Sequence, residues 1–432
     1  MGQNKNSDIF DLDDYLEQII KEPSKIFKNR DVMCSTYIPQ NLPHRDNQIK
    51  KMIQVLAPIL QNGNRSISNL FLYGKTGTGK TAVTMFVLKH IMRKCEENKI
   101  NNIKQCFINC RHVDTSYRVF ARLCEKIGLE IPFTGLPTDI VYEKFVNKLD
   151  EFDKGLMIVV LDEIDQLIKN DKNNKRPNKA LYGLTRINST LKNTQIHLIG
   201  ISNDLNFKNY LDGRILSSLG EEEIVFPPYN SIELEDILKE RAKMGLIDGV
   251  IDDGTISLAA GLAAREHGDA RRAINLLRVA GEIAERKCAN KITYEHIKEA
   301  IQNIEHDKIK ESVETLPLQS KLILWSIYLL EKQNLKENIT GDVYSTYIEV
   351  CRMLGLVEPL TQRRVGDLIN ELDMLGIINA KVVSLGRHGR TKKIRLDIPL
   401  KIIEDMIRSD PTLSPLLNFK LRNERLDKIL LS

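Results

Sequence analysis

The sequence predicts an α/β fold with a parallel sheet, followed by an all-helical domain and a C-terminal winged helix. Three observations support this prediction. Five short apolar runs alternate with helical patterns, the motif GKTGTGKT follows the first of these runs, and a basic hairpin pattern follows three helices near the end of the chain. Apolar strands that alternate with helices are typical of a parallel sheet covered on both faces.

The composition agrees with a chain of several globular domains. The 432 residues are 42% hydrophobic and 28% charged, which is ordinary for a chain of about three domains. No apolar run is long enough to cross a bilayer, and the chain starts with a polar, acidic stretch, so we expect neither a secreted nor a membrane protein. Seven scattered cysteines indicate a reducing cytoplasm, with Cys106 and Cys110 as buried thiols. The net charge of +5 does not by itself indicate nucleic acid.

Patterns along the chain predict four regions, namely an N-terminal extension, an α/β core, a helical domain, and a winged-helix domain with a C-terminal tail. Their expected boundaries are 1–43, 44–230, 231–310 and 311–432. The extension is expected to be helical to about residue 30. The core strands are expected at 69–74, 104–110, 155–162, 195–203 and 222–229. The helices of the third region are expected at 231–245, 252–268, 269–287 and 293–304, with a separate charged helix at 305–314.

Residues 74–81 form a complete phosphate-binding loop motif, which follows a predicted strand and opens a predicted helix. Glycines let successive backbone N–H groups point at phosphate oxygens, and the helix N-terminus adds its positive dipole end. The ammonium of Lys80 can reach the outer phosphates, and the hydroxyl of Thr81 can bind Mg²⁺. Nucleotide contacts are therefore expected from Thr76, Gly77, Thr78, Gly79, Lys80 and Thr81.

Polar side chains end two of the later strands. Asp162 and Glu163 follow the most continuous apolar run, and Asn203 ends the next strand. The carboxyl ends of parallel strands meet at one edge of the sheet, beside the phosphate loop. Asp162 is expected to bind Mg²⁺, Glu163 to polarise the attacking water, and Asn203 to orient that water without adding charge. An ordinary strand-end turn residue is the alternative for Asn203.

Two arginines are candidates for the neutralisation of γ-phosphate charge as the domains close. Arg271 starts a predicted helix of the helical domain, and Arg214 lies near the rim of the core. The alternative for each of them is an ordinary capping or salt-bridge arginine.

The third C-terminal helix, at 362–375, is amphipathic. Its apolar face is formed by Val365, Leu368, Ile369, Leu372 and Leu375. Its polar face, which could approach a major groove, is formed by Gln362, Arg363, Arg364, Asp367 and Asn370. Residues 381–395 of the following hairpin contain six basic residues and no acidic residue, which is typical of a DNA-binding wing. DNA contacts are expected from Arg363, Arg364, Arg387, Arg390 and Lys392. A winged helix that binds protein is the alternative.

Together and in this order, the motifs resemble those of the AAA+ ATPases. More narrowly, the chain resembles archaeal replication initiators related to the origin recognition complex and to the cell-division-cycle helicase loader of eukaryotes. The narrower resemblance is carried by YIPQNLPHRDNQI, PFTGLPTD, LIGISND, SSLGEEEIVFPPY and GDARRAINLLR. It implies ATP or ADP and Mg²⁺ as cofactors, and a loop at the end of the N-terminal extension that contacts the nucleotide base.

The resemblance also implies residue roles. It implies a catalytic set formed by Lys80, Asp162, Glu163, Asn203 and Arg271, in which Asn203 and Arg271 are the two sensors. It adds Tyr229 and Arg241 as nucleotide contacts between the ATPase and helical domains, and Arg214 as a candidate arginine finger. Relatives often have a proline before this arginine, whereas Gly213 here loosens the local backbone.

The resemblance implies a second DNA contact at Pro132, Thr134 and Gly135, within an initiator-specific insertion at 114–139; composition alone favours a simple surface loop. The implied protein is a cytoplasmic, nucleoid-associated initiator with slow ATPase activity and no membrane partner. It binds double-stranded origin DNA with other initiator copies and helps to recruit the replicative minichromosome maintenance helicase.

A protein-remodelling or loader ATPase with an accessory DNA-binding domain is the alternative function. The sequence shows no evident aromatic-hydrophobic-glycine pore loop between the second and third strands. A signalling or transposition ATPase with a DNA-binding tail is a third option.

Overall fold

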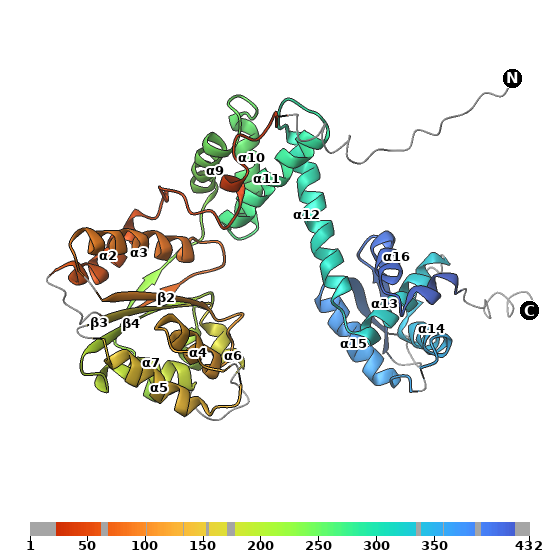
Figure 1. Cartoon of the computed structure of the whole chain (residues 1–432). Coiled ribbons are helices and arrows are strands. Elements are labelled where there is room, and N and C mark those ends of the chain that lie inside the picture. The colour runs from red at the N-terminus through yellow and green to blue at the C-terminus, as the bar shows by residue number, and fades with distance from the viewer. Residues whose placement is uncertain are drawn as a thin grey trace, which may run out of the picture. The chain divides into compact units, whose positions relative to one another are not determined.

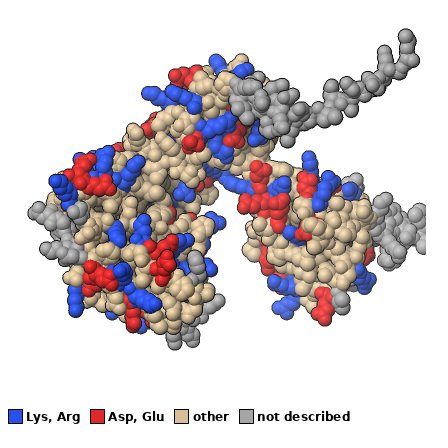
Figure 2. Space-filling model, viewed as in Figure 1, with Lys and Arg blue, Asp and Glu red and all other residues tan. Residues whose placement is uncertain are grey.

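A computed structural model describes residues 23–61, 68–100, 102–132, 134–152, 155–170, 178–333, 338–356, 358–384 and 390–419. Two compact units are present, Met1–Ala300 and Ile301–Ser432 (Figure 1). Within the described ranges, no helix is both long enough and apolar enough to span a bilayer. In Figure 2, basic and acidic side chains are interspersed on the visible face of each unit, in agreement with the small net charge.

A five-stranded parallel sheet forms the centre of the first unit, which confirms the predicted fold class. Its strands are β1 (Asn69–Tyr73), β2 (Ile103–Asn109), β3 (Gly155–Asp162), β4 (Thr194–Ser202) and β5 (Glu221–Val225). They lie in the order β2-β3-β4-β1-β5, and all neighbouring pairs are parallel. Tyr73 pairs with Ser202, and Asp162 pairs with Ile201. The C-terminal ends of β1, β3 and β4 therefore lie side by side at the same end of the sheet.

A sheet that is covered on both faces should bury all five of the predicted apolar strands, and this expectation is wrong for β5. Every residue of β3 is buried, whereas β5 exposes Glu222, Glu223 and Val225. The reason is position, because β5 is an edge strand that pairs only with β1 among the described strands. Charged side chains on such an edge discourage pairing with another chain.

Helices cover both faces of this sheet (Figure 1). One buried apolar cluster joins the sheet to α2 (Asp46–Leu56) and α3 (Lys80–Glu97). A second cluster joins the opposite face to α4 (Ser116–Lys126), α5 (Thr138–Asp150) and α7 (Lys179–Arg186). The short helices α6 (Asp165–Asn170) and α8 (Gly213–Leu216) follow β3 and β4. Cys106 and Cys110 are buried on the second face, as predicted.

The lid is the all-helical part of the first unit. It comprises α9 (Ser231–Gly245), α10 (Asp253–Arg265), α11 (Ala270–Arg286) and the start of α12 (Tyr294–Glu314). Side chains of Asn230, Asp252 and Asp269 cap the first three helices by accepting backbone N–H groups. The two last helices predicted for this region are one continuous helix, because neither proline nor glycine interrupts residues 294–314.

The predicted helical start of the chain is not supported where it can be compared. Residues 1–22 lie outside the described residues, and residues 23–30 form bends and one isolated bridge rather than a helix. Their backbone groups bond to the lid instead, since Lys28 and Asn29 donate N–H groups to the carbonyl of Gly245, and Ile247 donates to Ile26. A single 3₁₀ turn follows at Asp31–Met33.

The second unit is a winged helix, as predicted. After the second half of α12, its elements are α13 (Leu318–Lys332), β6 (Asn338–Ile339), α14 (Thr340–Met353), α15 (Gln362–Met374), β7 (Ile378–Ser384), β8 (Arg390–Leu396) and α16 (Leu400–Ser409). The three strands form an antiparallel sheet in the order β6-β8-β7. A single apolar core joins the helices to this sheet.

Two details of the second unit differ from the prediction. Leu375 was placed on the apolar face of the third helix, but it is 59% exposed at the C-cap of α15, which ends at Met374. Helix α16 was not predicted. Its signal is present, because four buried residues recur at helical spacing after Pro399, namely Ile402, Ile403, Met406 and Ile407.

Candidate nucleotide-binding site

The loop between β1 and α3 has a backbone that admits only glycine comfortably at two points. Gly77 and Gly79 have φ angles of +71° and +91°. Lys80 follows as the first residue of α3 and is only 4% exposed. Its Nζ donates to the carbonyl oxygens of Gly74 and Lys75, at 2.8 and 2.7 Å. Burial lowers the pKa of Lys80 to about 8, so the buried ammonium favours a nearby anion.

An acidic edge lies directly beside this loop, at the end of β3. The hydroxyl of Thr81 donates to Oδ2 of Asp162 at 2.9 Å, so the two predicted Mg²⁺ ligands are already together. Burial raises the pKa of Asp162, an effect that a bound cation would reverse. Hydroxyl and carboxylate oxygens are donors that suit Mg²⁺, so the residues present fit this ion.

Glu163 and Asn203 lie at the ends of adjacent strands. Glu163 has a φ angle of +53°, a left-handed conformation that is uncommon for a residue with a side chain, and its N–H donates to Oδ1 of Asp162 at 2.9 Å. The backbone N–H of Asn203 and the hydroxyl of Ser202 both donate to Asp165, at 3.2 and 3.3 Å. Asp165 is 3% exposed and was not predicted as part of the site, although it is the third acid of the DEID stretch.

A cavity of about 470 Å³ opens in front of the phosphate loop. Three parts of the first unit line it, namely residues 35–43, the phosphate loop with α3, and the lid. Six predicted nucleotide contacts are among the lining residues: Gly77, Gly79, Thr81, Tyr229, Arg241 and Arg271. The side chain of Thr78 instead points into the loop and donates to the carbonyl of Lys75 at 2.9 Å, and Thr76 is exposed. Only their backbone N–H groups are therefore expected to contact phosphate.

Arg45 is a buried residue that the sequence analysis did not assign to the site. It is 2% exposed, and its guanidinium donates to the carbonyls of Thr78 and Pro227, at 2.9 and 2.8 Å. The same group lies 3.6 Å from the ring centroid of Tyr229, a cation–π contact. A Cβ on Gly79 would lie 2.8 Å from the hydroxyl oxygen of that tyrosine. Arg45 therefore fixes Tyr229 against the phosphate loop. In the sequence, Arg45 is distinguished only by its place in the stretch HRDNQI.

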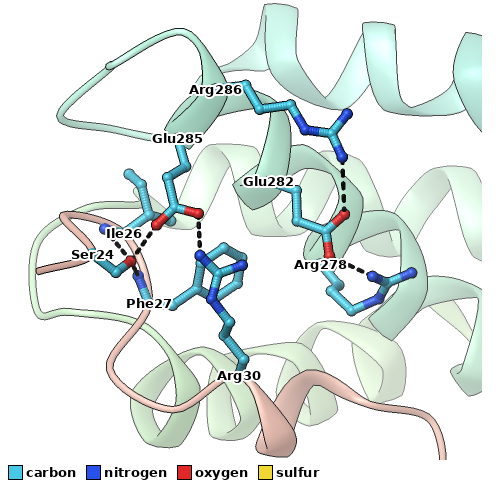
Figure 3. A network of polar contacts seen from close by, with 8 residues as sticks. All are labelled: Ser24, Ile26, Phe27, Arg30, Arg278, Glu282, Glu285 and Arg286. Atoms are coloured by element: carbon cyan, nitrogen blue, oxygen red, sulfur yellow. Dashed lines mark hydrogen bonds and ion pairs between the residues drawn. The ribbon is translucent and has the colours of Figure 1, made fainter. Parts of the chain in front are cut away.

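The N-terminal segment that leads into the cavity-lining residues is attached to the lid. We call this segment, residues 24–37, the lid strap. Figure 3 shows Glu285 of α11 accepting hydrogen bonds from both Ser24 and Arg30. The guanidinium carbon of Arg30 lies 4.6 Å from the ring centroid of Phe27. That ring packs on Gly281, where a Cβ would lie 2.6 Å from its nearest atom.

Arg241 connects the lid strap to the cavity. Its two terminal nitrogens donate to the carbonyls of Val32 and Tyr37, both at 2.9 Å. The next residues of the chain, within 38–43, line the cavity. Arg241 was predicted to line the nucleotide site, and it does line the cavity, but its guanidinium is engaged by the strap. The cavity wall therefore follows directly from a segment that the lid holds, whereas Leu42 near its end packs on the apolar cluster of the core.

Replacement of Gly281 by Ala tests the packing of the Phe27 ring against α11. We expect it to lower the melting temperature and to weaken ATP binding, because the new methyl group displaces the buried ring. Gly261→Ala on α10 is the matched control, since nothing lies within 4 Å of its Cβ position, and the gain in helix propensity should stabilise the protein by about 0.5–1 kcal/mol. Thermal unfolding and ATP titration measure both effects. Equal stabilisation by both variants would contradict the packing of the strap.

Arg214 is not among the residues that line the cavity. Its side chain is 61% exposed, and its Nε lies 2.9 Å from Oδ1 of Asp212, the residue that caps α8. This ion pair raises the pKa of Arg214 further above its ordinary value. The position leaves Arg214 accessible at the surface of the core, with its charge already paired.

The predicted DNA contacts of the first unit lie on the loop between α4 and α5. Pro132, Thr134 and Gly135 are all exposed. Gly135 has a φ angle of +106°, and no atom lies within 4 Å of its Cβ position. The hydroxyl of Tyr117 donates to the carbonyl of Pro132 and so attaches the loop to α4. The loop therefore offers an open backbone surface.

The predicted DNA contacts of the second unit lie on α15 and the hairpin. Arg363 and Arg364 are exposed in the first turn of α15. The guanidinium of Arg364 lies 3.9 Å from Asp367 and 3.8 Å from Glu371, so part of its charge is balanced. Lys392 donates to the side chain of Asn370 on α15, which attaches β8 to that helix. Arg387 lies outside the described residues, and only the backbone of Arg390 is described, in β8.

Three family models match successive parts of the chain. An AAA domain matches residues 64–207, a Cdc6 AAA+ ATPase-type lid domain matches 235–302, and a CDC6 C-terminal winged helix domain matches 311–406.

Proteins of known family are similar over nearly the full length. The ORC1-type DNA replication protein of Pyrococcus furiosus is 50% identical over 418 residues, which cover 96% of this chain and 97% of that protein. ORC1-type DNA replication protein 1 of Archaeoglobus fulgidus is 50% identical over 401 residues, which cover 93% and 95%. Among solved structures, the Aeropyrum pernix ORC1 protein in complex with DNA is 44% identical, with a TM-score of 0.77, and the match covers 91% of this chain and 100% of that one.

Proposed function

The chain belongs to the family of ORC1-type DNA replication proteins, and on that premise we propose that it is an ATP-regulated initiator that binds double-stranded origin DNA. In this proposal it acts in the cytoplasm at the nucleoid, together with other initiator copies, and helps to recruit the replicative minichromosome maintenance helicase. The observation that carries the proposal is the shared cavity, whose wall is formed by the phosphate loop, the lid and the chain that the lid holds. A nucleotide in this cavity would therefore contact the phosphate loop, the lid and residues 35–43 at the same time.

The residues of the cavity are assigned to nucleotide binding as follows. Backbone N–H groups of residues 76–81 and the ammonium of Lys80 bind the phosphates. Thr81 and Asp162 are the residues that would hold Mg²⁺, which neutralises charge on the β- and γ-phosphates when it is bound. Tyr229 and residues 35–43 form the wall for the base. This assignment is supported by the Thr81–Asp162 hydrogen bond and by the burial of Lys80.

Hydrolysis to ADP and phosphate is proposed to be slow. Glu163 accepts the proton of the attacking water, Asn203 orients the water, and Arg271 balances charge that develops on the γ-phosphate. Arg271 is exposed at the start of α11, so it acts only when the lid is closed over the nucleotide. ATP binding is therefore proposed to control the conformation of the protein, and the energy of hydrolysis is proposed to matter less.

DNA binding is assigned to two surfaces. In the second unit, Arg363 and Arg364 of α15 approach the major groove, while Arg387, Arg390 and Lys392 of the hairpin approach phosphates or the minor groove. In the first unit, Pro132, Thr134 and Gly135 bring backbone N–H groups to the sugar-phosphate chain. The exposure of Arg363 and Arg364 on α15, and of Pro132, Thr134 and Gly135 in the first unit, supports this assignment.

Footprinting on genomic fragments of the source organism, with and without ATP at physiological salt, tests the proposed function. A few discrete protected sites are expected, because base contacts add to the phosphate contacts that every duplex offers. Uniform weak protection that disappears as salt is raised would contradict an origin-specific initiator. In that case the protein-remodelling alternative would be preferred, and turnover stimulated by an unfolded protein would support it.

Replacement of Arg387 and Arg390 by Ala tests the wing. We expect lower DNA affinity and a salt dependence whose slope falls by about 1–2, because each lost phosphate contact removes about 0.9 of released counterion. Lys401→Ala, at an exposed lysine of α16, is the control and should leave the slope unchanged. Titration of a duplex at several salt concentrations gives the slope. An unchanged slope in the double variant would show that the wing does not contact phosphate.

A further inference from the structure

The N-terminal end of α11 is docked on the phosphate loop by Asp269. The amide of Ala270 donates to the carbonyl of Gly77 at 3.1 Å. A Cβ on Gly77 would lie 1.7 Å from Oδ1 of Asp269, so only a glycine lets this carboxylate approach the loop. The neighbouring Gly268 also lies close to the core, since its Cβ position is 2.2 Å from the carbonyl of Tyr229. Gly77 and Gly268 thus allow the start of α11 to lie against the phosphate loop and Tyr229.

The carboxylate of Asp269 has a second attachment on its own helix. Its Oδ1 accepts the backbone N–H groups of Arg271 and Arg272, at 2.8 and 3.2 Å, which caps α11. The negative charge is also felt in the phosphate site. Burial lowers the pKa of Lys80, and the charge of Asp269 is among the groups that oppose this effect. An acid is therefore fixed within electrostatic reach of the place where phosphates bind.

This position is unusual for an acid, because a phosphate site gains from positive charge. A diphosphate and a triphosphate differ by one phosphate group, and the triphosphate brings further negative charge to the same site. Arg271, which lines the cavity two residues later, attracts that charge, whereas Asp269 repels it. The balance of these two side chains makes the docked lid sensitive to the number of phosphates.

We propose that Asp269 is a specificity-determining residue that weakens the binding of triphosphate relative to diphosphate nucleotides. This inference rests on the proposed binding of ATP and ADP in the cavity. Its consequence is that the lid docks on the loop more readily over ADP than over ATP. The discrimination is built into the contact between α11 and Gly77 rather than into the metal site.

Asp269→Asn is the direct test, because asparagine has the same shape and is an equally good helix cap without the charge. We expect the ratio of ATP affinity to ADP affinity to rise on the order of tenfold, since the repulsion between two like unit charges at a separation on the order of 10 Å has an effect of that size at the effective dielectric constant of a protein. Asp269→Ser, which also caps without charge, should shift the ratio in the same direction. Isothermal titration of the full-length protein with each nucleotide and Mg²⁺ gives the ratio.

Asp252→Asn is the matched control, because Asp252 caps α10 in the same way, through a 2.7 Å bond from the N–H of Thr255, and lies beside Gly254 of its own helix, whereas Asp269 lies against Gly77 of the phosphate loop. It should leave the ratio unchanged. If the unaltered protein binds both nucleotides and neither Asp269 variant changes the ratio, the inference is wrong and the proposed function stands. If the unaltered protein binds neither nucleotide, both are wrong.

Discussion

Lys80→Ala is expected to weaken ATP binding by about 10- to 100-fold, because it removes charge-assisted hydrogen bonds worth about 1.5–3 kcal/mol to the phosphates. The loss should not come from unfolding. Burial lowers the pKa of Lys80 to about 8, which means that the fold disfavours this ammonium rather than depending on it. The melting temperature of the variant without nucleotide is therefore expected not to fall. Titration with ATP and thermal unfolding measure the two quantities.

Lys75→Ala is the control for this result, because Lys75 is an exposed lysine of the same loop. Only its backbone carbonyl contacts Lys80, and the substitution keeps that carbonyl. We expect ATP affinity within about threefold of the unaltered protein, as is usual for a surface charge. If the two variants lose affinity equally, the assignment of the phosphate site to Lys80 is wrong.

Glu163→Gln is expected to reduce the rate of ATP hydrolysis by about 100-fold or more, because it removes a proposed general base while it keeps the shape of the side chain. ATP affinity should change little, since Thr81 and Asp162 remain in place. Single-turnover hydrolysis and ATP titration separate the two effects. Glu222→Gln, at an exposed glutamate of β5, should leave both quantities unchanged.

Glu163→Gly is expected to lower the rate of ATP hydrolysis without lowering the stability of the protein. The φ angle of +53° strains a residue with a side chain by about 1–2 kcal/mol, and glycine removes that strain. We therefore expect this variant to hydrolyse ATP no faster than Glu163→Gln and to be at least as stable as the unaltered protein. A variant that hydrolyses ATP normally would contradict the role of Glu163, whatever its stability.

The elements of the fold could be predicted largely from the sequence because their signals are local. The buried strand β3 is a continuous apolar run, and the loop before α3 is a complete motif of eight residues. The edge position of β5 was not predictable in the same way. The exposure of three of its residues depends on having a neighbour on one side only, which is a property of the sheet and not of the segment.

The parts of the site that the sequence analysis missed are contacts between distant segments. Arg45 is 33 residues from Thr78 and 182 from Pro227, and Asp269 meets Gly77 only when the lid is docked. Neither residue has a periodicity or a neighbour that distinguishes it from an ordinary surface charge or helix cap. Leu375 was misplaced for a related reason, because helical spacing cannot tell where α15 ends.

The lid strap also determines when the nucleotide cavity can be completed during synthesis of the chain. Ser24 and its partner Glu285 are 261 residues apart, so this attachment of the strap cannot form until α11 has left the ribosome. At about 5–20 residues per second, the α/β core is finished several seconds before that moment. During this interval a nascent chain has a phosphate loop but only part of the cavity wall. We therefore expect the nascent core to hold nucleotide weakly, and tight retention to begin only after the lid is made.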